Sequence, residues 1–107
     1  MNLIHNYELN GGNHLRVAKL TAPKKIELFE EPLNKTPGPE EAVVNVKAVG
    51  ICGTDLHIFR GERADVALPR VMGHELSGVV EQVGEKVTHL KAGDCVVFDP
   101  VVSCGAC

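Results

Sequence analysis

The sequence contains no long hydrophobic run, no excess of positive charge and no internal repeat. A membrane-spanning helix needs about 18 consecutive apolar residues, and no segment approaches that length. The N-terminus also lacks the basic-then-apolar pattern of a signal peptide. We therefore expect no membrane partner and a reducing, cytoplasmic location, where four cysteines suggest metal or redox chemistry before disulfides. Eleven Lys and Arg against fourteen Asp and Glu leave a formal net charge of −3, which argues against binding to nucleic acid.

The chain is also too short for two complete domains. Its 107 residues predict one small domain, with no room for both a substrate site and a full dinucleotide-binding domain. We accordingly expect no residue of this chain to form a cofactor-binding site for NAD or NADP. The hydrophobic fraction of 44% and the charged fraction of 23% are typical of a soluble globular domain.

Short strand-like segments separated by glycine and proline dominate the rest of the pattern. Residues 1–14 are polar and without period, and we interpret them as an N-terminal extension. One helical turn is expected from Thr54 to Phe59, with Thr54 as its N-cap. The expected strands are 15–22, 26–31, 42–49, 76–83 and 95–98, with turns at 24–25 and 91–94. Many short strands with almost no helix predict a mainly β fold, a small barrel or sandwich.

Cys52 lies between two glycines, Gly50 and Gly53, which let the backbone turn and could open the thiol to a cleft. A cysteine after a strand is more often a buried small hydrophobe than a ligand. A metal-bound thiolate nevertheless needs this kind of access. His74 and Glu75 offer an imidazole and a carboxylate, both ligand types that suit zinc. Adjacent residues on a regular strand point to opposite faces, so either Gly73 bends the backbone or one of the two orients the other.

Thr54 and His57 are spaced i, i+3 and would share one face of a helical turn. A hydroxyl backed by an imidazole forms a plausible proton path. The alternative is that Thr54 only caps the turn and His57 is a solvated surface residue. Cys104 and Cys107 form a Cys-x-x-Cys pair, which is either half of a zinc site or a redox pair. The redox interpretation needs a helix starting at the first cysteine within a βαβ unit, and neither is predicted.

Together, these segments resemble the zinc-dependent medium-chain dehydrogenases. The resemblance runs from Leu15 to the end of the chain, and it is carried by the segments Gly50–His57, Gly73–Glu75 and Leu90–Asp94 in this order. It implies that residues 15–107 form the family's catalytic domain. That domain has a mainly β fold, a GroES-like partly open β-barrel with short helical turns.

The resemblance also implies residue roles. Cys52 and His74 would ligate the catalytic zinc, and Glu75 would be the adjacent carboxylate that binds the metal in some members and approaches it in others. Thr54 would hydrogen-bond the alcohol, and His57 would pass its proton toward solvent through the cofactor ribose.

Cys104 and Cys107 match the first two of the family's four structural-zinc cysteines. On this view the chain is truncated within the structural-zinc loop and the nucleotide-binding domain is absent. We therefore expect NAD or NADP to bind only in a full-length parent, and we expect the fragment alone to be inactive. The parent is expected to be a homo-oligomer.

The implied activity is zinc-assisted hydride transfer from a secondary alcohol, a polyol or a sugar acid to NAD(P). Residues 97–105 look most like the branch of the family that acts on polyols and sugar acids. Two alternatives stay open: a zinc-free quinone-reductase-type oxidoreductase on the same fold, and a non-catalytic GroES-like module.

Overall fold

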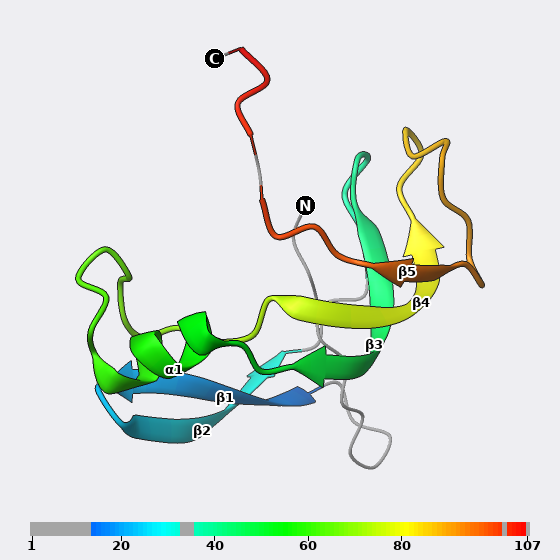
Figure 1. Ribbon diagram of the computed structural model, residues 1–107. Helices are drawn as coiled ribbons and strands as arrows, with labels where there is room; N and C mark the ends of the chain where they lie inside the picture. Colours follow the sequence, from blue (N-terminus) through cyan, green and yellow to red (C-terminus); the bar gives the residue numbers. More distant parts are fainter. Residues whose placement is uncertain (1–13, 33–35, 102, 107) are drawn as a thin grey trace.

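The computed structural model describes residues 14–32, 36–101 and 103–106. In these ranges the elements follow in the order β1 (His14–Ala22), β2 (Lys25–Pro32), β3 (Ala42–Gly50), α1 (Gly53–Arg60), β4 (Glu75–Val83) and β5 (Cys95–Val97). Strands β1 and β2 form one antiparallel sheet, and β3, β4 and β5 form a second in the order β3-β4-β5 (Figure 1). The expected mainly β fold is confirmed.

The two sheets of the described chain are open rather than closed into one barrel. A backbone bridge between Leu20 of β1 and Arg70, in the connection before β4, links the two parts. Leu20 donates to the Arg70 carbonyl at 2.8 Å, and Arg70 donates back to the Leu20 carbonyl at 3.0 Å. The hairpin is thereby tied to the segment that leads into the larger sheet.

The β1–β2 hairpin closes earlier than predicted. Its turn lies at Pro23 and Lys24, where Lys24 has a φ of 62°, and Lys25 already belongs to β2. Strand β1 begins at His14, so the predicted extension is at least one residue too long at that end. The rest of that extension, residues 1–13, lies outside the described residues.

The core of the larger sheet comes from the valine-rich strand β3 and its partner β4. Ala42, Val43 and Val44 are buried in succession, which strict alternation of faces would not allow. A register shift between Val43 and Val44 explains this pattern, because it lets neighbouring side chains turn toward the same side. On β4, Leu76 and Val80 alternate with less buried neighbours and complete the core.

The helix differs from the sequence prediction in length and in its cap. α1 spans eight residues rather than one turn, and its N-cap is Cys52 rather than Thr54. The physical reason is Asp55, whose carboxylate accepts a hydrogen bond from the Cys52 N–H at 3.1 Å. This is the reciprocal half of a capping box, and it starts the helix two residues earlier than a Thr54 cap would.

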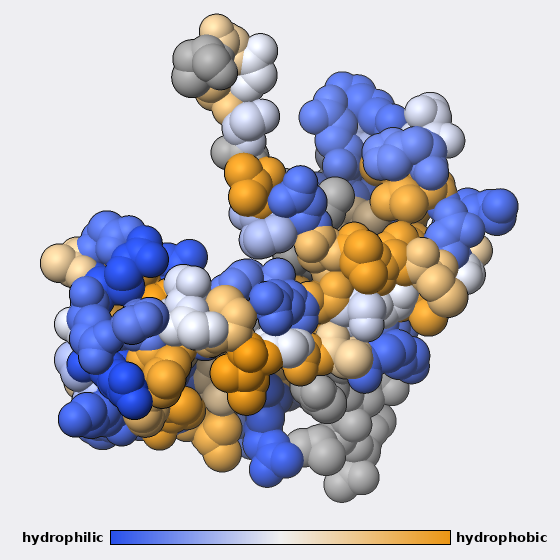
Figure 2. All heavy atoms as spheres, in the orientation of Figure 1, coloured by the Kyte–Doolittle hydropathy of each residue, from blue (hydrophilic) through white to orange (hydrophobic). Residues whose placement is uncertain are grey.

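Apolar side chains remain exposed on the surface of the described chain. Figure 2 shows hydrophobic residues across the middle of one face and near β5. Val97 of β5 is 82% exposed, and Val101 beyond it is 74% exposed. Among the described residues, no helix combines the length and the apolar character needed to cross a membrane.

Candidate metal centre

The first side chain of the candidate site lies at the junction of β3 and α1. Cys52 follows the end of β3 and caps α1, with extended φ and ψ of −109° and 171°. It is a free, partly buried cysteine. Its thiol therefore lies where the chain changes from strand to helix, and the Cys52 N–H and carbonyl are both hydrogen-bonded to Asp55.

The second side chain, His74, comes from the residue just before β4. Gly73 precedes it with a φ of 103°, in the left-handed region that favours glycine. The His74 Nε2 atom lies 3.0 Å from the Cys52 Sγ atom. An imidazole and a thiol that are 22 positions apart in the sequence thus face each other directly.

Behind this pair lies Asp55, which is only 7% exposed and is the buried charged residue of the described core. One carboxylate oxygen accepts from the Cys52 N–H at 3.1 Å, and the other lies 3.4 Å from the His74 Nδ1 atom. The carboxylate therefore contacts both of its neighbours in the group. A proton held on Nδ1 would face the carboxylate and leave the Nε2 lone pair directed at the thiol.

These three residues form a compact donor group. One ligand atom from each of Cys52, Asp55 and His74 lies within 4.8 Å of the other two, and no other such group of three occurs in the part of the chain that the structure describes. Thiolate sulfur, imidazole nitrogen and carboxylate oxygen are the three ligand types that zinc takes in proteins. The residues present therefore fit a zinc ion.

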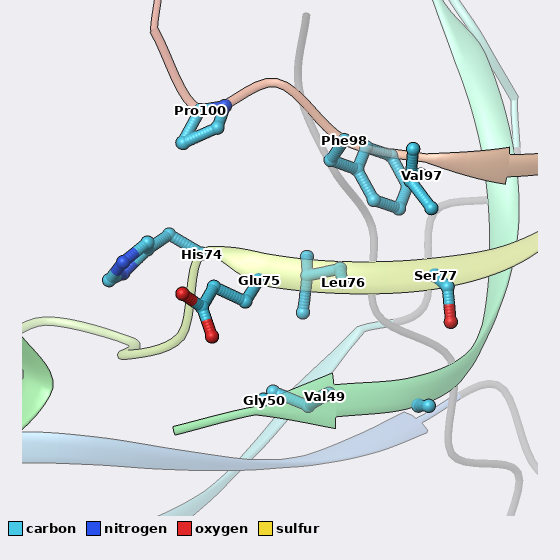
Figure 3. Close-up of a pocket in the computed structure, with 10 residues that line it drawn as sticks. Val49, Gly50, His74, Glu75, Leu76, Ser77, Val97, Phe98 and Pro100 are labelled. Carbon is cyan, nitrogen blue, oxygen red and sulfur yellow. The ribbon is translucent and has the colours of Figure 1, made fainter. Parts of the chain in front are cut away.

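Glu75 belongs to a different environment from its neighbour His74. It is exposed, it is the register partner of Gly50 across β3 and β4, and it is not part of the donor group. Figure 3 shows the Glu75 carboxylate directed toward Gly50, while the His74 ring points away to the side. The positive φ of Gly73 does not bring both side chains into one cluster.

Thr54 and His57 both lie on α1 and are exposed. The His57 Nδ1 atom contacts the Glu62 carboxylate, just beyond the end of the helix. This hydrogen bond to His57 is the main reason why the pKa of the Glu62 carboxyl is below its usual value. The structure thus places an acidic side chain directly beside the His57 imidazole.

The Cys-x-x-Cys pair lies in the tail beyond β5. Cys104 is exposed, and its sulfur accepts the Ala106 N–H at 3.4 Å. Cys107 lies outside the described residues. The expected zinc half-site therefore stays a prediction.

A cavity of about 760 Å³ opens beside His74. Its walls are the adjoining ends of β3 and β4 together with the segment after β5, which contributes Phe98 and Pro100 (Figure 3). Most of the lining is apolar, with His74, Glu75 and Ser77 as the polar side chains. A small organic molecule in this cavity would lie next to the imidazole of the donor group.

Asp55 is a residue of the donor group that was not predicted from the sequence. The signal that could have identified it is the Cys-x-x-Asp spacing at the start of a helix, since an acidic residue at the third helical position commonly turns back to the N-cap N–H. Assigning the cap to Thr54 removed that signal. The contact with His74 had no sequence signal, because it depends on how the connection before β4 returns to the helix.

Comparisons with known proteins agree with the geometry. Residues 38–107 match the family of the alcohol dehydrogenase GroES-like domain. The chain is 48% identical to sorbitol dehydrogenase of Arabidopsis thaliana over 73 residues, which is 65% of this chain and 20% of that protein. It is 47% identical to L-idonate 5-dehydrogenase of Vitis vinifera, again over 65% of this chain and 20% of that protein.

A solved structure shows the same fold. The alcohol dehydrogenase rspB of Escherichia coli CFT073, in complex with NADH, superposes with a TM-score of 0.77 at 43% identity, over 90% of this chain and 27% of that one. The chain thus spans between 20% and 27% of the length of these relatives. Because the family model matches well over half of the chain, the protein belongs to the family of alcohol dehydrogenase GroES-like domains.

Proposed function

We propose that residues 15–107 are the zinc-binding catalytic domain of an NAD(P)-dependent dehydrogenase that oxidises a secondary alcohol, a polyol or a sugar acid. The observation that carries the proposal is the convergence of the Cys52 thiol and the His74 imidazole at 3.0 Å, backed by the buried Asp55 carboxylate. A zinc-free oxidoreductase or a purely structural module would have no need for this donor set.

Cys52 and His74 are the residues that would hold the zinc. Asp55 orients both of them, because its two oxygens contact the Cys52 N–H and the His74 Nδ1 atom. When bound, zinc supplies Lewis acidity that lowers the pKa of the substrate hydroxyl. Glu75 stays a candidate ligand by family resemblance, although its carboxylate lies against Gly50 in this structure.

The remaining steps concern protons and hydride. Thr54 would accept the hydrogen bond of the substrate hydroxyl, and His57 would carry the released proton toward solvent. A nicotinamide cofactor bound outside this chain would supply the acceptor for the hydride of the alcohol carbon, so the overall products would be a carbonyl compound, NAD(P)H and one proton. The exposure of both side chains on one helix is compatible with a proton path to water.

The substrate class and the cofactor are inferred from the relatives. Two of them are a sorbitol dehydrogenase and an L-idonate 5-dehydrogenase, and the solved relative carries NADH. We infer that the whole protein acts on a polyol or a sugar acid with a nicotinamide cofactor bound outside this chain. Cys104 and Cys107 would contribute to a structural zinc site in that larger protein.

Zinc titration of the purified chain tests the proposal. We expect the binding of about one zinc ion per chain to be lost in the Cys52→Ala, His74→Ala double variant. The matched control is Cys95→Ala, His89→Ala, which removes the same two ligand types at exposed positions outside the donor group. Equal zinc binding by the two double variants would contradict the proposal.

A further inference from the structure

Gly50 and Glu75 face each other where β3 ends and β4 begins. They are register partners, and both line the cavity that also contains His74 (Figure 3). Gly50 lies two residues before Cys52, and Glu75 directly follows His74. The pair is therefore joined by backbone to both residues that would hold the metal.

The space that a side chain at Gly50 would need is occupied by the Glu75 side chain. A Cβ atom at this position would lie 2.7 Å from the Glu75 Oε2 atom and 3.1 Å from the Glu75 Cβ atom. Both distances are shorter than ordinary van der Waals contact between such atoms. The backbone of Gly50 is not in the left-handed region, so conformation alone would permit any residue here.

We propose that Gly50 is a positioning residue for the Glu75 carboxylate. Because Gly50 has no Cβ atom, the Glu75 carboxylate can lie directly against the end of β3, at the cavity wall shared with His74. From this position the negative charge favours a cation held by Cys52 and His74, because opposite charges attract and the attraction weakens as the distance between them grows. This inference rests on the proposed zinc function.

This proposal predicts that adding one methyl group at position 50 changes the zinc affinity. In Gly50→Ala the new Cβ would lie 2.7 Å from the Glu75 Oε2 atom, so the end of the Glu75 side chain must shift away from β3. Since Glu75 is exposed, its carboxylate has room to move away from the cavity wall that it shares with His74. Zinc should then bind more weakly although Cys52, Asp55 and His74 are unchanged.

The test is a double-mutant cycle on zinc affinity, measured by chelator competition. We expect Gly50→Ala to raise the zinc dissociation constant about threefold or more, and to have no further effect in the Glu75→Ala background. Gly53→Ala is the matched control, because a Cβ at Gly53 would meet nothing within 4 Å. An unchanged or tightened zinc affinity in Gly50→Ala, or an equal loss in both backgrounds, would overturn the proposal.

A second measurement separates this inference from the proposed function. In metal-free protein, Gly50→Ala should lower the denaturant midpoint when Glu75 is present and lower it clearly less in Glu75→Ala. That coupling requires only the close contact between Gly50 and the Glu75 side chain, and it requires no zinc. If the wild-type chain binds no zinc, the proposed function fails, and the role of Gly50 in metal binding fails with it. If the coupling is missing in the metal-free protein, only the positioning of the Glu75 carboxylate by Gly50 is overturned.

Discussion

At the scale of single residues, Asp55 is a charged group that the fold has removed from water. Burying a carboxylate costs free energy unless hydrogen bonds or opposite charges offset that cost. Here the partners are the Cys52 N–H at 3.1 Å and the His74 Nδ1 atom at 3.4 Å, so both belong to the donor group. The same contacts that make the burial tolerable also fix the orientation of the thiol and the imidazole.

Replacing Asp55 by asparagine separates these two roles. The Asn side-chain oxygen can still accept the Cys52 N–H and cap α1, but its NH₂ group cannot accept a hydrogen bond from the His74 Nδ1–H group. We expect Asp55→Asn to weaken zinc binding about 10–100-fold, the usual effect of removing the group that orients a metal-binding histidine. Chelator competition measures this change.

The control for this prediction is Asp99→Asn. Asp99 is also a carboxylate that accepts one backbone N–H, from Val101 at 3.0 Å, but it is exposed and lies outside the donor group. Its zinc affinity should equal that of the wild type. If Asp55→Asn binds zinc as tightly as Asp99→Asn does, the carboxylate does not orient His74.

At the scale of elements, α1 is held at its C-terminal end by the tip of the β1–β2 hairpin. Lys24 donates to the Phe59 carbonyl at 2.7 Å, and Gly61 caps the C-terminal end of the helix with φ and ψ of 77° and 21°. A Cβ at Gly61 would lie 2.7 Å and 2.9 Å from two carbon atoms of Pro23. The left-handed cap and the close hairpin therefore both require glycine at this position.

Gly61→Ala should accordingly destabilise the fold for two reasons. The left-handed conformation costs a residue with a Cβ about 1–2 kcal/mol. The collision with Pro23 adds a cost of about 1–3 kcal/mol, typical of overpacking. Denaturant unfolding of the purified variant measures the sum as a lower free energy of unfolding.

Gly93→Ala isolates the conformational contribution. Gly93 also has a positive φ, 94°, but a Cβ there would meet nothing within 4 Å. This variant should lose only the conformational part, so Gly61→Ala should be the less stable of the two. Equal losses would mean that the hairpin does not press against the end of α1.

The elements that could be predicted from sequence are those with a strong local pattern. The β-branched segment Ala42–Gly50 is a strand for this reason, and the Lys91–Asp94 turn was recognised by its glycine. The start of α1 was predicted wrongly, because Thr54 is the better cap by residue type, whereas the Asp55 contact decided the outcome. Local preference was outweighed here by one side-chain hydrogen bond.

The candidate site was predictable only in part for a related reason. Cys52 and His74 carry recognisable ligand types, and the structure brings them together. Whether Glu75 joined them depended on the register of β3 and β4, which pairs it with Gly50. Register between distant strands is not encoded in any one segment, so neither this separation nor the contact of Asp55 with His74 could be derived from motifs.

At the scale of the whole molecule, the apolar surface is unevenly covered. Leu20, Val43 and Val80 are almost completely buried, while Val97 on the edge strand β5 is 82% exposed. Val97 also lines the open cavity of about 760 Å³ beside His74, and hydrophobic residues lie at the surface near β5 in Figure 2. The larger sheet therefore has a packed side and an uncovered apolar edge.

The difference in burial between Val97 and Val80 predicts that the same substitution has a small effect on stability at one position and a large effect at the other. Val97→Thr exchanges a methyl for a hydroxyl in water and should change the free energy of unfolding by no more than about 0.5 kcal/mol. Val80→Thr makes the same exchange at 2% exposure and should cost about 1–3 kcal/mol, since the hydroxyl is removed from water. Denaturant unfolding compares the two, and sedimentation at several concentrations accompanies it. If Val97→Thr loses as much unfolding free energy as Val80→Thr, Val97 is covered in solution. If the sedimentation also depends on concentration, the cover is a second copy of the chain, because self-association buries an edge residue more as the protein is concentrated.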